Sequence, residues 1–344
     1  MKYSVTIGIP VYNIEKYIRV GLESALAQTF PDIEFLILDD CGTDSSMDIV
    51  REYQQSHPRG GDIHILRQPH NMGIGKGRNR IISEAQGQYL YFLDADDTIA
   101  PNTIELLYNA ARKYDAELVY GSYERVDMRS GNEERTVCRY DSRQFLRPDE
   151  YATWVYRKYE GIQATVWNML IDVNVYRSNG LSFQAVNYWE DFMLTIDLPT
   201  YVTRVVLLPD ITYSYYLRLG SASKFQERSK ISKSELENTI NGMNKIKDNS
   251  QRIAGKSYFP LRMKKVMTTC YFVANTIVHN SGIITPSFSN EEIRDVMRSP
   301  LSFAQILSFR QARLQNLVFY ALGKMPSPAT VLLLRAIGDL KKLL

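Results

Sequence analysis

The sequence predicts an α/β protein with a mixed, mostly parallel sheet flanked by helices, followed by a C-terminal helical region. Two observations predict this fold. Over residues 1–125, short segments rich in β-branched residues alternate with segments of helical periodicity, and such alternation is typical of βαβ units. From Ser229 onward, the apolar residues follow helical spacing throughout. The apolar content of 44% is ordinary for a globular protein.

The predicted strands are short apolar segments rich in β-branched and aromatic residues, and those before Asp39 and Asp94 end at residues that favour turns. In chain order they are Ser4–Pro10, Ile33–Leu38, Asp62–Leu66, Tyr89–Leu93, Leu118–Tyr123 and Leu207–Tyr216. Polar residues at 10–15, 39–44 and 94–97 each follow one of these strands. Ligands of parallel sheets bind beyond the carboxyl ends of the strands, so we expect these three segments to converge on one crevice.

The segments between the strands predict helices, because their apolar residues recur at helical spacing. In chain order these are Glu15–Gln28, Thr43–Gln55, Ile74–Gln86 and Asn102–Tyr114. Residues 125–165 are charged and weakly patterned, and they predict an insertion or lid with one short helix near Pro148–Lys158. The expected C-terminal helices are Glu235–Asp248, Phe259–His279, Asn290–Arg298, Phe303–Gly323 and Ala329–Leu344. We place the domain boundary near residue 225, which gives domains 1–225 and 226–344.

Charge is distributed unevenly along the chain. Residues 1–240 carry 26 basic and 33 acidic residues, a net charge of −7. Residues 241–344 carry 15 basic and 5 acidic residues, a net charge of +10. A basic C-terminal region indicates an anionic partner, either a membrane surface or a nucleic acid. No nucleic-acid-binding module is recognisable, so we expect no nucleic acid partner.

The three cysteines are far apart and form no CxxC pair. They therefore predict neither a zinc site nor a disulfide framework, and a reduced, cytoplasmic setting fits. No signal peptide is evident at the N-terminus. The longest apolar runs, such as Leu317–Leu322, are too short to span a bilayer.

The sharpest motif is Asp94-Ala95-Asp96-Asp97, directly after the predicted strand Tyr89–Leu93. Two carboxylates at i and i+2 can hold an oxygen-seeking divalent ion whose coordination is completed by phosphate oxygens and water. Such an ion stabilises the charge that builds up on a diphosphate leaving group. A solvated turn before the next helix is the alternative, but we expect metal and phosphate binding here.

Three further segments carry candidate site residues. Asp39-Asp40 ends the second predicted strand, where one carboxylate could contact a ligand while Asp44 caps the following helix. The glycine-rich segment Asn71–Asn79 matches neither GxxxxGK[ST] nor GxGxxG, so it is either a phosphate-approaching helix entry or a tight loop. Glu190-Asp191 offers a second carboxylate centre, suited to removing a proton from a hydroxyl, or else the acidic N-terminus of a helix.

Taken in order, these segments resemble family 2 glycosyltransferases, inverting enzymes of the GT-A fold that use nucleotide sugars and commonly build bacterial cell-surface polysaccharides. The resemblance covers about residues 3–225. The matching segments are Val5–Asn13, Gln28–Phe30, Asp39-Asp40 with Thr43–Ser45, Asn71–Asn79, Asp94–Asp97, Val166–Asn168, Glu190-Asp191 and Arg218–Ser223. In place of the family's usual Asp-Asp-Gly-Ser-Thr-Asp and Trp-Asn-Lys-Leu, the chain has residues 39–44 (DDCGTD) and 167–170 (WNML).

The resemblance implies a role for each matched residue. Asp191 would be the catalytic base, and Asp96, with Asp94, would bind a divalent metal, Mn or Mg. Asp40 would contact the uracil edge, and Arg218 and Ser221 would belong to a mobile loop near the diphosphate. The residues expected to bind the nucleotide sugar are Pro10, Tyr12, Asn13, Asp39, Asp40, Asn71, Gly73, Arg78, Asn79, Asp94, Ala95, Glu190, Arg218 and Ser221.

The resulting functional hypothesis is metal-assisted transfer of a sugar from a nucleotide sugar, a UDP-sugar, to a hydroxyl of a glycan or lipid-linked glycan. The alternatives are a nucleotidyltransferase acting on a sugar phosphate and a non-catalytic nucleotide-sugar-binding protein. The last predicted helix, Ala329–Leu344, combines apolar and basic residues. It either packs on the core or lies on the inner face of a membrane, and the latter would make the protein peripheral.

Overall fold

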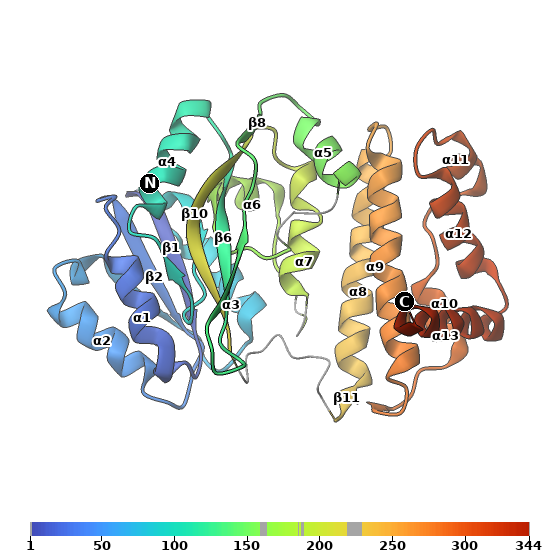
Figure 1. Cartoon of the computed structure of the whole chain (residues 1–344), viewed down its shortest axis with the longest axis horizontal. Helices are drawn as coiled ribbons and strands as arrows, with labels where there is room; N and C mark the ends of the chain where they lie inside the picture. The colour runs from blue at the N-terminus through green and yellow to red at the C-terminus, as the bar shows by residue number, and fades with distance from the viewer. Residues whose placement is uncertain (1, 159–163, 185, 187–188, 219–228, 344) are drawn as a thin grey trace. The chain divides into compact units, whose positions relative to one another are not determined.

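The computed structural model describes residues 2–343 apart from 159–163, 185, 187–188 and 219–228. The described chain divides into two compact units (Figure 1). The first comprises Met1–Tyr151, Gly161–Ala185 and Glu190–Ser223, and the second comprises Ala152–Glu160, Val186–Trp189 and Lys224–Leu344. The functional boundary near residue 225 stays a prediction.

The first unit is built on a mixed sheet whose central path runs β3-β2-β1-β4-β9-β6-β10-β5, with β7 paired to β6 and β8 paired to β10. Its strands are β1 (Tyr3–Val11), β2 (Ile33–Asp39), β3 (Ile63–Arg67), β4 (Gly87–Phe92), β5 (Thr98–Ile99), β6 (Leu118–Asp127), β7 (Glu134–Cys138), β8 (Arg143–Phe145), β9 (Met169–Asp172) and β10 (Val205–Leu217). β1 pairs in parallel with β2 and β4, and β10 pairs in parallel with β6. The predicted mostly parallel α/β fold is confirmed.

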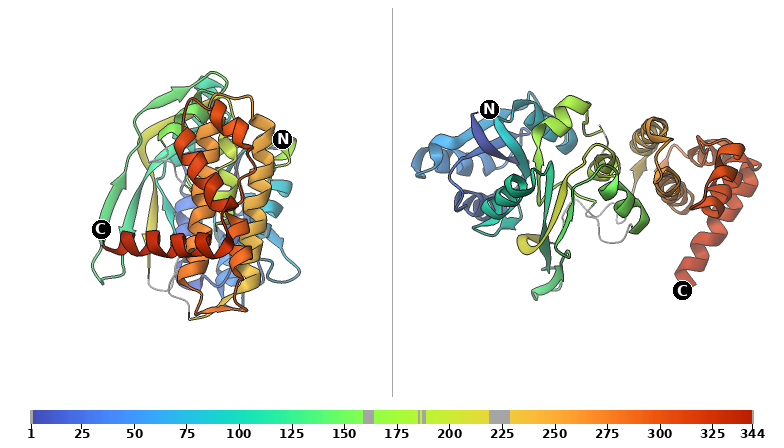
Figure 2. Two further views of the ribbon diagram at one scale, coloured as in Figure 1. Left: turned by 90° about the vertical axis from the view of Figure 1, so that its right-hand side faces the viewer. Right: turned by 90° about the horizontal axis from the view of Figure 1, so that it is seen from above.

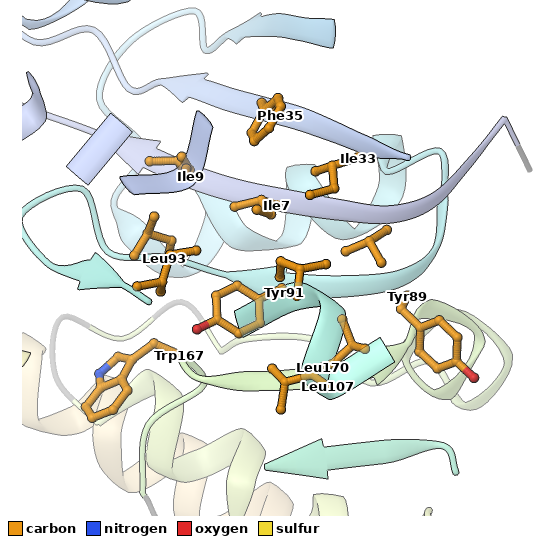
Figure 3. Close-up of a cluster of buried hydrophobic side chains, with 14 of the residues drawn as sticks. Ile7, Ile9, Ile33, Phe35, Tyr89, Tyr91, Leu93, Leu107, Trp167 and Leu170 are labelled. Atoms are coloured by element: carbon orange, nitrogen blue, oxygen red, sulfur yellow. The ribbon is translucent and has the colours of Figure 1, made fainter. Parts of the chain in front are cut away.

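Helices flank this sheet because their apolar stripes need a buried surface. They are α1 (Glu15–Leu26), α2 (Ser46–Ser56), α3 (Ile74–Glu84), α4 (Thr103–Tyr114), α6 (Val173–Asn179) and α7 (Glu190–Thr195). The centre of the core lies around β1, where Ile7 is opposite Phe35 of β2 and Tyr91 of β4 (Figure 3). All three side chains are fully buried. Central parallel strands are apolar on both faces, which explains why these segments could be predicted.

The second unit is helical apart from the short pair β11 (Ile231–Ser232) and β12 (Ile284–Thr285). Its helices are α8 (Lys233–Ser250), α9 (Phe259–His279), α10 (Asn290–Val296), α11 (Phe303–Ser308), α12 (Arg313–Lys324) and α13 (Ser327–Leu343), and most of α5 (Glu150–Lys158) groups with them. Within this unit α10, α12 and α13 pack on α9 (Figure 2). Buried Arg262 of α9 donates to Tyr156 of α5 at 2.7 Å.

Two predictions about secondary structure are wrong. Residues 125–165 hold not only the expected helix but also β7 and β8, which extend the sheet. β7 is an exposed edge strand with charged residues, and because its pairing uses backbone groups it leaves no apolar pattern in the sequence. The helix expected over Phe303–Gly323 is two helices, separated where Ala312 adopts a left-handed φ of 52°. Apolar periodicity continues across this break because both helices bury a face.

Asn168 fixes the irregular chain just before β9. It has a φ of 56° and is fully buried. Its amide nitrogen donates to the carbonyls of Gly121 and Ser122 at 2.7 and 3.0 Å. Its amide oxygen accepts from Thr212 at 2.7 Å and Tyr91 at 3.2 Å. The side chain therefore links β4, β6 and β10 beneath the carboxyl end of the sheet.

We expect Asn168→Ala to lower the free energy of unfolding by about 3 kcal/mol, because several buried polar groups lose their partner and alanine is strained at positive φ. Urea unfolding measures this. The control is Asn102→Ala, since Asn102 is exposed and makes no side-chain cap bond to α4. Equal effects of the two substitutions would contradict the role assigned to Asn168.

Candidate active site

Three of the candidate segments follow neighbouring parallel strands. Residues 12–15 follow β1, residues 40–44 follow β2, and residues 94–97 follow β4, and β1 lies between the other two strands. The carboxyl ends of parallel neighbours meet at one edge of the sheet. The expected convergence of these segments is therefore present.

Arg78 of α3 joins this edge to the start of α7. The guanidinium is almost fully buried, with 2% of the side chain exposed. Its Nη2 donates to Asp94 at 2.9 Å, and its Nη1 donates to Glu190 at 3.2 Å and to Asp191. Three carboxylates from two distant parts of the sequence thus share one cation. The aromatic rings of Phe92 and Phe183 lie 5.8 and 5.5 Å from the guanidinium carbon.

The electrostatics of this cluster are unbalanced, because one guanidinium faces three carboxylates. Burial raises the pKa of Asp191 to about 7, although the nearby Arg78 lowers it. Burial also raises the pKa of Glu190, again opposed by Arg78. Burial alone would lower the pKa of Arg78, but Asp191, Asp94 and Glu190 raise it above its ordinary value. Arg78 is therefore charged, and Asp191 titrates near neutral pH.

Asp96 lies on the same turn but contacts a different arginine. Arg218 donates to the Asp96 carbonyl at 2.6 Å, and its guanidinium lies 3.5 Å from the Asp96 carboxylate. Its guanidinium carbon also lies over the rings of Tyr17 and Tyr216, at 4.2 and 4.5 Å. Burial and the neighbouring Asp94 raise the pKa of Asp96. Arg218, expected near a diphosphate, is thus placed at the DxD turn.

The donor set at this turn suits a divalent cation that a ligand helps to coordinate. Asp94 and Asp96 supply carboxylate oxygens, with 26% and 31% of their side chains exposed. Among the described residues, no three or more His, Cys, Asp or Glu side chains form a group that could hold a metal by itself. Mg²⁺ is commonly bound by one or two carboxylates together with phosphate oxygens and water, and the two carboxylates fit that mode.

Asp97 is a structural carboxylate that the sequence alone did not single out. It is buried, and it accepts from the Tyr213 hydroxyl at 2.7 Å and the Tyr216 amide at 2.8 Å. Burial, with Asp94 and Asp96, raises its pKa well above the ordinary value. The Tyr213 ring stacks on Trp167 at 4.4 Å. The sequence predicted an acidic turn here because these residues follow a buried strand. Only the fold shows which of the carboxylates face inward.

The carboxylates at the end of β2 organise loops. Both oxygens of Asp40 accept backbone hydrogen bonds, from Met72 at 2.9 Å and Gly73 at 3.1 Å. Asp39 accepts from the Cys41 amide at 2.9 Å. Both side chains are buried. The contact of Asp40 with a uracil edge stays a prediction, and its observed role is to hold the loop that precedes α3.

Residues after β1 meet the same loop region. The Asn13 side-chain oxygen accepts from the Thr43 amide at 2.7 Å. Asp44 accepts from the amides of Ser46 at 3.1 Å and Glu15 at 2.8 Å, so it joins the starts of α1 and α2. The N-cap position of α2 is Ser45, and not Asp44 as the sequence had suggested. Pro10 is partly buried, whereas half of the Tyr12 surface is exposed, which leaves its ring accessible to a ligand.

The glycine-rich segment positions α3 by close packing. Gly73 precedes the helix with a φ of 82°, and its amide also donates to Asn71 at 3.1 Å. A Cβ on Gly77 would lie 2.4 Å from the Leu38 side chain. The side-chain oxygen of Asn79 accepts from the Phe183 amide at 2.8 Å, and its side-chain nitrogen donates to the Phe183 carbonyl at 2.9 Å. The observed contacts of the Asn79 side chain are therefore with the Phe183 backbone.

The remaining predicted residues are Ala95 and Ser221. Ala95 is buried beneath α1, and a Cβ on Gly21 would lie 2.4 Å from its carbonyl oxygen. Ser221 lies outside the described residues, so its place near the site stays a prediction.

The fold and the acidic strand ends define an α/β protein with a candidate site at the carboxyl end of its parallel strands, and comparison with known proteins identifies its family. Residues 6–184, just over half of the chain, match the profile of "Glycosyl transferase family 2". The chain belongs to this family, which confirms the resemblance of its motifs.

Individual relatives agree with this family. The glycosyltransferase GlyG of Streptococcus pneumoniae is 33% identical over 132 residues, covering 38% of this chain and 43% of GlyG, so the match spans less than half of that protein. The cholesterol galactosyltransferase of Borreliella burgdorferi is 21% identical over 81% of this chain and 80% of that protein. S. aureus TarS 1–349, solved in complex with UDP-GlcNAc, has the same fold at a TM-score of 0.58 and 17% identity, covering 93% of this chain and 90% of TarS.

We expect Arg78→Met to lower the free energy of unfolding by about 3–5 kcal/mol at about pH 8, because buried carboxylates lose their counter-ion. Arg78 lowers the pKa of Asp191 and Glu190. Removing it raises those pKa values further, so the folded variant binds protons more tightly than its unfolded chain. Its deficit relative to the wild type should therefore shrink as the pH falls from alkaline values toward about 7, where the wild-type Asp191 also takes up its proton.

Urea unfolding at both ends of that pH range measures this deficit. The matched control is Arg80→Met on the same helix, where Arg80 is exposed and pairs with Glu84 at i,i+4. We expect its effect to stay within about 0.5 kcal/mol. A deficit for Arg78→Met that does not change with pH would contradict the charge-neutralising role.

Proposed function

We propose that the protein is an inverting glycosyltransferase that moves a sugar from a UDP-sugar to a hydroxyl of a glycan or lipid-linked glycan. One observation carries the proposal. Arg78 places Asp191, the candidate base, and Asp94, a candidate donor-site carboxylate, on adjacent nitrogens of one buried guanidinium. A base and a donor-binding carboxylate at one site are what a direct transfer to a hydroxyl requires.

The choice of a nucleotide-sugar donor rests on the family and on the fold shared with TarS, which was solved with UDP-GlcNAc. Tyr12, half-exposed after β1, offers a face for the base. The Gly73 and Met72 amides, held by Asp40, shape the adjoining loop. Which sugar is transferred is left to a panel of UDP-sugars, with release of UDP as the readout.

In this proposal Asp96 and Asp94 hold a divalent metal, Mn or Mg, which supplies positive charge to the diphosphate as it leaves. Arg218, already within 3.5 Å of Asp96, adds a permanent cation at the same turn. Its contacts with the rings of Tyr17 and Tyr216 keep the charge at this edge. The two carboxylates, through the metal, and Arg218 therefore stabilise the negative charge of the donor's diphosphate.

Asp191 acts on the acceptor in this proposal. The hydroxyl oxygen of the acceptor forms a bond to the anomeric carbon as the bond from that carbon to the diphosphate breaks, and the hydroxyl proton passes to the Asp191 carboxylate. A single displacement of this kind inverts the anomeric centre. A pKa of about 7 for Asp191 gives a base that is partly deprotonated at neutral pH and still able to hold the proton.

A lipid-linked acceptor would place the enzyme at the inner face of a membrane, as a peripheral protein in the cytoplasm. No helix among the described residues is long and apolar enough to cross a bilayer. The proposal therefore concerns contact with a membrane surface.

We expect Asp191→Asn to reduce sugar transfer by about 10³-fold, because the amide cannot accept the proton, while binding of UDP with metal is retained. Transfer is measured by UDP release and binding by isothermal titration. Asp210→Asn, at an exposed position of β10, is the control and should transfer at the wild-type rate. Wild-type transfer by Asp191→Asn would refute the assignment of the base.

We expect Asp96→Asn to lose most of the gain in UDP affinity that Mn²⁺ gives, more than about tenfold, because one ligand carboxylate is removed. Titrations with Mn²⁺ and with a chelator measure this gain. Asp97→Asn is the comparison, since Asp97 bonds to Tyr213 and should affect thermal stability instead. If the wild type binds UDP equally well with and without metal, the metal proposal fails.

The same titrations separate the two alternative functions. A nucleotidyltransferase would bind a nucleoside triphosphate and release diphosphate. A non-catalytic binding protein would bind UDP-sugar without releasing UDP. Release of UDP that depends on a hydroxyl acceptor is expected only for the glycosyltransferase.

A further inference from the structure

The last helices of the second unit expose several large apolar side chains. α11, α12 and α13 follow one another at residues 303–343. The exposed large apolar residues on them are Phe303, Leu307, Leu314, Val318, Leu332, Leu333 and Ile337. Single exposed apolar residues are ordinary, but a gathering of them marks a surface that binds a partner. We call these seven residues the C-terminal apolar surface.

On α12 the exposed apolar residues form one face. Leu314 and Val318 are four residues apart, and 71% and 50% of their surfaces are exposed. Asn316 and Gly323, on the opposite side of the helix, are buried and face the rest of the unit. Residues at i and i+4 share a helix face. The helix therefore buries one side in the protein and presents a second apolar side outward.

Exposed apolar residues also occur beside buried ones on the neighbouring helices. On α13, Val331 and Leu334 are buried while Leu332, Leu333 and Ile337 are exposed. On α11, Phe303 and Leu307 are exposed four residues apart.

Two contacts connect these helices. Phe303 contacts Tyr320 of α12, with ring centroids 6.0 Å apart. Thr330 of α13 donates to the Leu322 carbonyl of α12 at 2.9 Å. α12 and α13 also both pack on α9 (Figure 2). The exposed faces therefore belong to connected helices.

Positive charge accompanies these apolar faces. Residues 299–344 carry six basic residues and one acidic residue. Four of the basic side chains, those of Arg310, Arg313, Lys324 and Arg335, lie in the described part and are exposed. An apolar face with basic residues around it is the pattern of interfacial helices, which bury the apolar side at the level of the headgroups and pair the cations with anionic lipids.

We propose that the C-terminal apolar surface binds the surface of a membrane that contains anionic lipids. This surface extends over α11, α12 and α13, and thus beyond the single last helix that the sequence suggested. A second copy of the chain would bring its basic residues against those of the first. A nucleic acid would leave the apolar side chains in water. The inference rests on the proposed function at one point only: a lipid-linked acceptor would explain why the enzyme binds a membrane.

The test is flotation of the full chain with phosphatidylcholine vesicles, with and without phosphatidylglycerol. We expect the wild type to float with the anionic vesicles and to bind less tightly as salt rises. The double variant L314S/V318S should bind at least about tenfold more weakly, because it loses two apolar side chains from the contact. The double variant K324Q/R335Q should lose affinity for the anionic vesicles only, by about fivefold per charge.

The matched control is Val20→Ser, which replaces an equally exposed valine on α1 of the first unit and should float like the wild type. Thermal unfolding checks that each variant is folded. No flotation of the wild type, or equal flotation of L314S/V318S, overturns the proposal. Self-association that L314S/V318S abolishes, without vesicle binding, would assign the surface to a second copy instead. Vesicle binding is measured without donor, so its failure is distinct from a failure of sugar transfer.

Discussion

The ion cluster around Arg78 is the constraint on which the candidate site depends. Arg78 draws together Asp94 and the pair Glu190-Asp191, which lie 16 and 112–113 residues away in the sequence. A buried cation must be paired, since removal from water costs several kcal/mol per ion. Here one guanidinium contacts three carboxylates, so the cluster has more acidic groups than basic ones. That excess raises the affinity of the site for protons and cations, and these are what a base and a metal-assisted reaction use.

The position of Arg78 depends on close packing of α3 against the sheet. Gly77 has no room for a Cβ beside Leu38 of β2, and Gly8 of β1 has none beside Ile81 of α3. These glycines let the helix backbone approach the strands, so the guanidinium reaches the carboxyl end of β4. The glycine-rich sequence, which could have been a phosphate loop, is thus explained by packing. Gly73 alone has a positive φ at the start of the helix, where the loop held by Asp40 ends.

The sequence predicts what is local or periodic, and it fails where the determinant is tertiary. The central strands could be predicted because they are apolar on both faces, and their order placed residues 94–97 and 39–40 at one edge. β7 could not, because an edge strand such as Glu134–Cys138 is defined by backbone pairing and has charged side chains. The pairing of Arg78 with Glu190 and the inward orientation of Asp97 could not be predicted either, since they depend on contacts more than 100 residues apart. The break before α12 was hidden by continuous apolar spacing.

The net charge of +3 says little about how this chain meets its partners, because the two regions differ in sign. Residues 1–240 carry −7 and residues 241–344 carry +10. Salt screens charges over about 10 Å, so a partner responds to the charges near its contact and not to the total. An anionic donor approaching an acidic site therefore needs local cations, which Arg218 and a bound metal would supply. An anionic membrane would likewise respond mainly to the basic residues on the helices that carry the C-terminal apolar surface. If both proposals hold, the uneven charge would let one chain bind two kinds of anion, the donor through residues of the first unit and the membrane through residues of the second.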